Sequence, residues 1–355
     1  MKIHNFSAGP AILPASVLEE AAQAVLNFNN RGLSILEVSH RGKDIVAVVD
    51  EAEALIRELL GVGDDYAVLF LTGGASSQFF MTAMNLLNDD ETAAYLNTGT
   101  WSNKAIKEAK NFGTIDIIGS SKEQNYTFIP KDYIVKPSTK YLHYTTNNTV
   151  YGTQFHHVPK VPEGTMLVAD MSSDIFSRPV DGKQYDIIYA GAQKNLGPAG
   201  VTLVILKKSI LGNVQRMIPT MLDYRTHIEK SSMFNTPPVY PIYVSMLTLR
   251  WIKALGGLKA MEDRNRAKAE LLYAEIDRNP LFKGTTAVED RSWMNATFVA
   301  DSPEHEAAFL EYCKANKVDG LKGHRSVGGF RASMYNALGL DSVQHLVDLM
   351  QNFKP

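Results

Sequence analysis

The sequence predicts an α/β protein: a large domain built on a mostly parallel sheet, plus a smaller α+β C-terminal domain. Short apolar runs alternate with helical stretches between about residues 66 and 206, which is the strand–helix rhythm of an open α/β sheet. Most of these runs are continuous rather than alternating, as parallel strands buried on both faces should be. The length of 355 residues also exceeds what one hydrophobic core usually supports.

Two helices precede the first predicted strand. Ser16-Val17-Leu18-Glu19 has the spacing of a capping box, and apolar residues follow it with helical period. A second amphipathic helix is expected over about 44–60, with Gly61 as its stop. The predicted strands then cover 66–71, 115–118, 141–144, 166–169, 186–190 and 201–206, with helices at 78–87 and 102–111 between them.

The pattern changes after Gly256-Gly257, where a long amphipathic helix ends. Beyond it we expect helices at 258–279, after Ser302-Pro303 and after a capping Asp341, with strands near 294–299, 321–325 and 328–335. These elements are fewer and farther apart. We therefore predict an N-terminal segment, 1–15, associated with the small domain, a large domain, 16–255, and a small domain, 256–355.

Charge and composition exclude several classes of protein. With 36 basic and 38 acidic side chains the formal net charge is −2, which disfavours nucleic-acid binding by bulk charge. No stretch approaches the roughly 18 apolar residues of a membrane span, and the N-terminus lacks a signal-peptide pattern. We expect a cytoplasmic protein. The lone cysteine, Cys313, rules out an intrachain disulfide and multi-thiolate metal sites, and no metal site is predicted.

A lysine follows a buried strand in a glycine-rich turn. Residues 185–200 read Tyr-Asp-Ile-Ile-Tyr-Ala-Gly-Ala-Gln-Lys-Asn-Leu-Gly-Pro-Ala-Gly, which places Lys194 just beyond the apolar run. Ligands of open α/β sheets bind at the carboxyl ends of strands, and a partly desolvated lysine there can attack a carbonyl carbon. A solvated loop lysine is the alternative, and for a lone lysine it is the commoner outcome.

Features at three other strand ends favour a reactive Lys194 over a solvated loop lysine. Asp170 ends the run 166–169, and a buried carboxylate there needs a positive partner such as the ring nitrogen of pyridoxal phosphate. The loop 72–79, Thr-Gly-Gly-Ala-Ser-Ser-Gln-Phe, opens a helix and offers backbone N–H groups to an anion. Trp101, in a further strand-to-helix loop, can stack on a flat ring. Alternatively, Asp170 could cap a turn, the loop 72–79 could be a plain helix cap, and Trp101 could be a core residue. All these features follow strands of one sheet, and together they predict pyridoxal 5'-phosphate as cofactor.

Five segments carry a family resemblance: Asn5-Phe6-Ser7-Ala8-Gly9-Pro10, Glu37-Val38-Ser39-His40-Arg41-Gly42-Lys43, Ala190-Gly191-Ala192-Gln193-Lys194-Asn195, Ser232-Met233-Phe234-Asn235-Thr236-Pro237-Pro238 and Leu321-Lys322-Gly323-His324-Arg325. With these segments the sequence resembles, over essentially its whole length, the phosphoserine aminotransferases. These are fold type I pyridoxal-phosphate enzymes of the class V aminotransferase group. The third and fourth segments are the most specific.

The resemblance implies roles at the cofactor. Lys194 holds it as a Schiff base, Asp170 meets the pyridine nitrogen and Trp101 stacks on the ring. The remaining implied contacts are Ala75, Ser76, Thr149 and Gln193, together with Asn235 and Thr236 from the partner subunit of a homodimer.

The resemblance also implies the reaction: reversible amino transfer between glutamate and 3-phosphohydroxypyruvate, giving O-phosphoserine and 2-oxoglutarate in serine biosynthesis, with vitamin B6 biosynthesis as a second pathway. Arg331 would clamp the substrate α-carboxylate. His324 and Arg325, with His40 and Arg41 from the partner, would hold the substrate phosphate or the side-chain carboxylate of glutamate. The residue types fit, because arginine binds both anions with a bidentate fork.

Other functions stay open on the sequence. Another class V enzyme, such as an alanine/serine–glyoxylate or serine–pyruvate aminotransferase, has substrates with no second anion and would not need two His-Arg pairs. A cysteine desulfurase needs a mobile catalytic cysteine, and Cys313 lies in a predicted helix. A cofactor-binding regulator would keep Lys194 but would not need a substrate clamp, and a structural protein would need neither.

Overall fold

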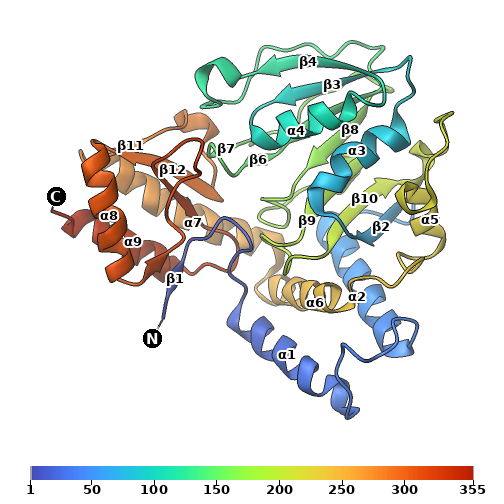
Figure 1. Cartoon of the computed structure of the whole chain (residues 1–355), viewed down its shortest axis with the longest axis horizontal. Helices are drawn as coiled ribbons and strands as arrows, with labels where there is room; N and C mark the ends of the chain where they lie inside the picture. Colours follow the sequence, from blue (N-terminus) through green and yellow to red (C-terminus); the bar gives the residue numbers. More distant parts are fainter. Residues whose placement is uncertain (1, 355) are drawn as a thin grey trace.

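The computed structural model describes residues 2–354 and confirms the α/β prediction (Figure 1). Its largest sheet has seven strands in the order β2-β10-β9-β8-β5-β3-β4, and the pairings are parallel except those made by β10. The strands are β2 (Tyr66–Leu71), β3 (Thr92–Asn97), β4 (Thr114–Ser120), β5 (Tyr141–Thr145), β8 (Met166–Asp170), β9 (Ile187–Gly191) and β10 (Thr202–Lys207).

Helices cover both faces of this sheet (Figure 1). One face carries α1 (Ala15–Leu26), α2 (Lys43–Leu60) and α6 (Val239–Ala254), and the other α3 (Gly74–Leu86), α4 (Thr100–Ala109) and α5 (Tyr224–Glu229). Along β2, Val68 and Phe70 belong to the first core, whereas Leu69 and Leu71 belong to the second. Burial on both faces is the reason why the strands read as continuous apolar runs.

A second body of structure follows α6. Its three-stranded sheet, β11-β12-β14, packs with α7, α8 and α9 around a core of its own, in which Phe282, Phe298, Phe309 and Phe330 are in contact. The bounds are α7 (Gly257–Arg278), β11 (Phe282–Gly284), β12 (Asn295–Ala300), α8 (Pro303–Ala315), β14 (Phe330–Ser333) and α9 (Leu340–Asn352).

The N-terminal strand belongs spatially to this second body. β1 (His4–Asn5) pairs in parallel with β13 (Val318–Asp319). A further small pair is formed by β6 (Asn147–Asn148) and β7 (Thr153–Gln154) beside the large sheet. The short 3-10 helices are η1 (Phe28–Asn30), η2 (Lys122–Gln124), η3 (Gly182–Gln184), η4 (Lys208–Ile210), η5 (Thr220–Leu222) and η6 (Val288–Asp290). The numerical domain boundaries stay a prediction.

Two helix ends match the expected signals. Gly61 ends α2 in the left-handed conformation, with φ 66°, which glycine adopts without a steric penalty. Ser302 caps α8 by accepting a hydrogen bond from the His305 N–H at 3.1 Å.

Other local predictions were wrong. The N-cap of α1 is Pro14 and makes no side-chain cap, so Ser16 lies inside the first turn and forms no capping box. Likewise α9 begins at Leu340 after Gly339, which places Asp341 in the first turn instead of at the cap. Trp101 lies in the first turn of α4 rather than in the preceding loop.

The expected strand at 321–325 is reduced to one bridge, between Lys322 and Phe330. The chain turns back on itself there, with hydrogen bonds from the N–H groups of Val327 and Gly328 to the His324 carbonyl at 2.8 and 2.9 Å. Only glycine fits at position 323, because a Cβ on Gly323 would lie 2.0 Å from the carbonyl oxygen of Gly328. Among residues 2–354 no helix is long and apolar enough to cross a lipid bilayer, and the same residues hold no cluster of three or more metal-ligating side chains.

Candidate active site

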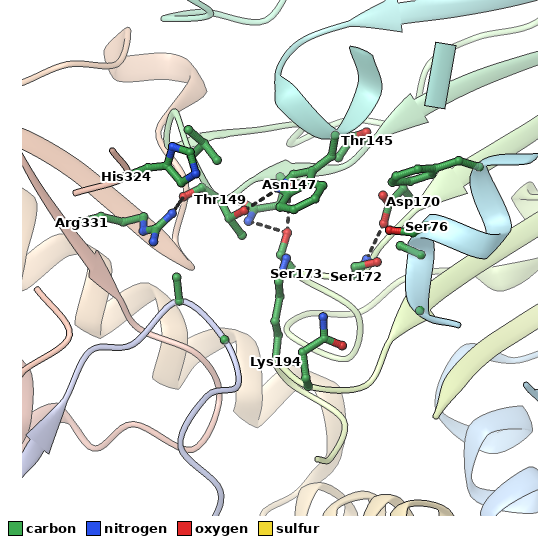
Figure 2. Close-up of a pocket in the computed structure, with 18 residues that line it drawn as sticks. Ser76, Thr145, Asn147, Thr149, Asp170, Ser172, Ser173, Lys194, His324 and Arg331 are labelled. Carbon is green, nitrogen blue, oxygen red and sulfur yellow. Dashed lines mark hydrogen bonds between the residues drawn. The ribbon is translucent and has the colours of Figure 1, made fainter. Parts of the chain in front are cut away.

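The carboxyl ends of the parallel strands open onto one cavity of about 320 Å³ (Figure 2). Side chains that follow β2, β3, β5, β8 and β9 meet there because parallel strands end at the same edge of a sheet. His324 and Arg331 reach the cavity from the second body of structure. The lining residues are Ala8, Gly9, Gly74, Ala75, Ser76, Phe79, Trp101, Thr145, Asn147, Thr149, Val150, Asp170, Ser172, Ser173, Gln193, Lys194, His324 and Arg331.

Lys194 projects into this cavity from the turn after β9 (Figure 2). The turn is tied by hydrogen bonds from the N–H groups of Leu196 and Gly197 to the carbonyl of Ala192, at 3.2 and 2.8 Å. Burial lowers the pKa of the Lys194 amine to about 8, although the charge of Asp170 opposes this change. The lowered pKa increases the uncharged fraction of the amine near neutral pH, and an uncharged amine can act as nucleophile or base.

Asp170 is buried at the end of β8, with 3% of its surface exposed. Its Oδ1 accepts a hydrogen bond from the Ser172 N–H at 2.9 Å. Burial raises the pKa of this carboxyl, while Ser172 and the Lys194 amine act in the opposite direction. The neighbouring Thr145 pairs with Asp170 across the β5–β8 ladder, and its buried hydroxyl has no hydrogen-bond partner within residues 2–354. The site thus holds a carboxylate and a hydroxyl that a ligand could satisfy.

The loop between β2 and α3 forms an anion cradle. Gly73 and Gly74 have φ values of 94° and 66°, and a Cβ on Gly73 would lie 1.8 Å from Ser77 Oγ, so only glycine fits there. The first N–H groups of α3 have no acceptor within the helix, and the helix dipole adds positive potential. Ala75 and Ser76 sit at this helix start and line the cavity. This geometry suits a phosphate.

Trp101 is fixed in orientation by its own hydrogen bond. The indole Nε1 donates to Thr149 Oγ1 at 2.9 Å, and the Lys194 Nζ lies 5.9 Å from the centroid of the ring. The loop before Trp101 is held by Ser102, whose Oγ accepts from the N–H groups of Thr98 and Gly99, both at 2.9 Å. A flat aromatic surface is therefore presented to the cavity beside the lysine.

Arg331 and His324 place a guanidinium and an imidazole on the opposite wall (Figure 2). Arg331 donates from Nη1 to the Thr149 carbonyl at 3.2 Å, and its buried Nε has no acceptor within the described residues. Burial lowers the pKa of the Arg331 guanidinium. The pKa of His324 is also lowered, by partial burial and then by the charges of Arg331 and Arg325. An anion placed here would satisfy the unpaired donor and offset the crowded positive charge.

The structure brings nine of the predicted site residues to this one cavity, namely Ala75, Ser76, Trp101, Thr149, Asp170, Gln193, Lys194, His324 and Arg331. Five others lie elsewhere in the chain. Arg325 is exposed in the loop beside His324, and His40 and Arg41 occupy a turn before α2. Asn235 and Thr236 line a separate cavity of about 160 Å³, which is shared with Thr72, Gly73 and Ser77.

Several lining residues were missed from the sequence. Thr145 and Asn147 lie one and three residues beyond a predicted strand, and Ser172 and Ser173 lie two and three residues after Asp170, so the strand-end rule contained the signal for all four. Asn147 Nδ2 donates to Ser173 Oγ at 2.9 Å and to Asn295 Oδ1 at 2.8 Å.

Ala8 and Gly9 line the cavity from the N-terminal segment. Ala11 N–H donates to the Gln193 carbonyl at 2.8 Å, which ties that segment to the lysine turn.

A family model described as aminotransferase class-V matches residues 3–346. The chain therefore belongs to the class V aminotransferase family, as the resemblance implied.

Proteins similar to this chain over its full length include phosphoserine aminotransferases. That of Flavobacterium johnsoniae is 59% identical over 99% of this chain and 98% of the relative. The structure of the enzyme from Bacillus circulans subsp. alkalophilus superposes with a TM-score of 0.96 at 44% identity, over 99% of this chain and 98% of that chain. A phosphoserine aminotransferase of Trichomonas vaginalis, solved with pyridoxal phosphate bound, has a TM-score of 0.93 at 38% identity, over 99% and 100% of the two chains.

Proposed function

We propose that this protein catalyses reversible amino transfer between glutamate and 3-phosphohydroxypyruvate, giving O-phosphoserine and 2-oxoglutarate in serine biosynthesis. The observation that carries the proposal is that Lys194 and Asp170 share one cavity with two anion-binding side chains, the guanidinium of Arg331 and the imidazole of His324. Full-length similarity to phosphoserine aminotransferases supports the choice of substrate. An alanine–glyoxylate type of reaction would not use the second anion-binding group, since its substrates carry one anion each.

The residues fit pyridoxal phosphate as cofactor. The start of α3 at Ala75 and Ser76 would hold its phosphate, and Trp101 would lie against its ring. Asp170, which is buried with few donors around it, suits a protonated ring nitrogen, because a carboxylate in that place needs a positive partner. Thr149 and Gln193 add polar contacts in the same cavity. When bound, the cofactor supplies an electron sink for charge that develops at the substrate α-carbon.

Lys194 is the group that would move the proton. Its amine, with a pKa of about 8, can take a proton from the substrate α-carbon and return it, acting as general base and then as general acid. Asp170 would keep the ring nitrogen protonated by its negative charge while this happens. The lowered pKa of Lys194 and its position beside Trp101 support this division of roles.

The opposite wall would bind the substrate at two points. Arg331 would clamp the α-carboxylate with its free guanidinium edge, and His324 with Arg325 would bind the distal phosphate or carboxylate. The phosphorylated four-carbon hydroxy acid of vitamin B6 synthesis carries the same two anionic ends, and we propose it as a second substrate.

The direct test is to give the purified, cofactor-loaded protein glutamate and one oxo acid at a time. We expect O-phosphoserine to form from 3-phosphohydroxypyruvate far faster than alanine forms from pyruvate or glycine from glyoxylate, with products followed by mass spectrometry. Equal rates with all three acceptors would overturn the assignment of the distal anion site.

The protein is further proposed to be a homodimer with shared active sites. Asn235 and Thr236 would contact the cofactor phosphate of the partner subunit, and His40 and Arg41 would enter its substrate pocket. The buried Nε2 of His40 has no partner within the described chain. Nearby apolar side chains are exposed, with Leu26 at 76%, Leu33 at 43% and Leu36 at 65%, and such a surface favours a protein contact.

Mixing two inactive variants tests this arrangement. Lys194→Ala and Arg41→Ala each remove one component, but a hybrid dimer keeps one complete site. After the variants are unfolded and refolded together, roughly a quarter of wild-type activity should return, because half of the dimers are hybrids with one intact site. No recovery from a mixture that contains hybrid dimers would contradict the shared site.

Two further proposals concern the chain as a whole. We propose that residues 16–255 form the cofactor domain, 256–355 the small domain, and 1–15 a segment associated with the latter, which the β1–β13 pairing supports. We also propose that the enzyme works in the cytoplasm, and cell fractionation with an activity assay would check this.

A further inference from the structure

We propose that Asn336 is a positioning residue for the transamination reaction. It joins the chain segments that carry Lys194, Asp170 and Arg331, and thereby fixes the amine relative to the carboxylate clamp. This inference rests on the proposed function and assigns a role to a residue that lies outside the cavity.

Asn336 makes one hydrogen bond to each of three different segments. Its backbone N–H donates to Oδ1 of Asn195, the residue next to Lys194, at 3.0 Å. Its Nδ2 donates at 2.9 Å to the carbonyl of Phe176, in the segment that follows Asp170. Its Oδ1 accepts from Asn265 Nδ2, on α7, at 2.8 Å. Asn336 itself follows β14, the strand that carries Arg331.

The junction is dry, so water does not replace these bonds. Asn336 is 1% exposed, Asn195 3% and Asn265 0%. A buried amide that loses its partner destabilises the fold, so each bond strongly favours the single arrangement in which all are made. The three segments are thereby held in one relative position.

The partners of Asn336 are anchored in turn. Asn195 Nδ2 donates to the Ser173 carbonyl at 3.3 Å, and Asn265 Nδ2 donates to the Ser177 carbonyl at 2.9 Å. Lys268, which is fully buried, donates to the carbonyls of Met334 and Tyr335 at 2.8 and 2.7 Å. The stretch between Arg331 and Asn336 is therefore held by α7 as well as by the lysine turn.

This rigidity bears on catalysis because Arg331 and Lys194 come from different parts of the fold. A substrate held by Arg331 must present its α-carbon within reach of the Lys194 amine. A displacement of about 1 Å can cost roughly 100-fold in rate. If the hydrogen bonds of Asn336 are lost, Arg331 should still bind the substrate, but the substrate α-carbon should lie less accurately at the Lys194 amine. The expected signature is a lower kcat with a nearly unchanged KM.

The test compares Asn336→Ala, which removes the side-chain bonds to Phe176 and Asn265 and keeps the backbone bond to Asn195, with a matched control, Asn279→Ala. Asn279 is also a buried asparagine with three hydrogen bonds, to Glu275, Met350 and Leu281, but it lies away from the cavity. Both variants should lose thermal stability. Only Asn336→Ala should lower kcat with O-phosphoserine and 2-oxoglutarate by about 10- to 100-fold, with KM changed by less than about threefold.

A second readout uses the cofactor-free protein. The pH dependence of Lys194 acetylation, followed by mass spectrometry, gives the apparent pKa of the Lys194 amine. This pKa depends on how deeply the turn after β9 buries the amine. In Asn336→Ala the apparent pKa of Lys194 should rise toward its ordinary value, whereas in Asn279→Ala it should match the wild type. Should Asn336→Ala fail to give folded protein, Asn336→Asp replaces it, since that near-isosteric change turns the donor to the Phe176 carbonyl into a carboxyl oxygen and keeps the acceptor for Asn265.

The proposal is overturned if the Asn336 variant and the Asn279 variant show the same kcat, the same KM and the same Lys194 titration. Failure of the proposed function looks different. In that case the wild-type protein itself would not transaminate O-phosphoserine, and the role of Asn336 would be judged on the lysine titration alone.

Discussion

The two walls of the cavity are built differently. On the sheet side, Asp170, Asn147 and Ser173 are buried and held by hydrogen bonds to neighbouring strand ends. On the facing side, His324 lies in a loop whose next residue, Arg325, is exposed to solvent. The buried sheet wall is suited to hold the cofactor in one fixed position. The facing wall, with its exposed loop, is suited to admit and release the two substrates. Changes on the sheet wall should therefore cost far more than changes on the facing wall.

The largest effect is expected at Lys194. Lys194→Ala removes both the covalent attachment point and the proton-transfer group, so kcat should fall by roughly 10⁴-fold, the upper end for general acid–base catalysis. A stopped assay of O-phosphoserine formation measures the loss. Lys183→Ala, at an exposed position, is the control and should keep wild-type activity. Near-normal turnover by Lys194→Ala would break the assignment of the sheet wall.

Asp170→Asn should rank second. The neutral amide keeps the shape but cannot hold a ring nitrogen protonated, and kcat should fall on the order of 100- to 1,000-fold, as when one preorganised electrostatic group is removed. The protein should still bind the cofactor, which absorbance of the dialysed protein checks. An unchanged kcat would show that the buried carboxylate serves only to hold the fold.

Arg331→Lys tests the facing wall at its most buried cation. Lysine keeps the charge but loses the planar fork, so KM for O-phosphoserine and for glutamate should both rise by roughly 10- to 100-fold, the value of a hydrogen bond to a charged group. Steady-state kinetics with each substrate measures this. A rise for only one of the two substrates would place Arg331 at the distal anion instead of the shared α-carboxylate.

The pKa of Lys194 gives a pH prediction. Below a pKa of about 8 the amine is protonated and cannot attack an aldehyde, so the free-amine fraction falls with pH. The association rate of pyridoxal phosphate with the cofactor-free protein should level off above pH 8 and fall by about tenfold per pH unit below it. Stopped-flow absorbance measures the rate. A plateau reached only near pH 10 would show that burial does not lower this pKa.

The smallest effect is expected at Arg325. Because it is exposed, its attraction for the substrate phosphate is screened, and Arg325→Ala should raise KM for O-phosphoserine by only about fivefold, in line with a surface ion pair of up to roughly 1 kcal/mol. Added salt should reduce the difference from wild type. An effect as large as that at Arg331 would remove the contrast between the buried and exposed cations.

The sheet wall could be predicted from the sequence because a simple rule governs it. Buried parallel strands read as apolar runs, and their carboxyl ends meet at one edge. Lys194, Asp170 and Gly74 each lie just beyond such a run, so their meeting in one cavity follows from this rule.

The facing wall obeys no comparable rule. The apolar and glycine-rich pattern around Gly323 predicts a strand, but the chain forms a turn there, closed by hydrogen bonds to the His324 carbonyl. The role proposed for Asn336 depends on contacts with Asn195 and Asn265, which lie far away in the sequence. His40 and Arg41 can be judged only with a second copy of the chain beside the first.

The central claim is a catalytic lysine that faces two anion sites, and one mixing experiment tests it most directly. O-Phosphoserine and alanine are added separately to the yellow, cofactor-loaded protein without any oxo acid. We predict that O-phosphoserine bleaches the colour at low concentration while alanine, which carries no second anion, leaves it unchanged. Bleaching by both amino acids at similar concentrations would contradict the two-anion site, and no bleaching by either would contradict the aminotransferase itself.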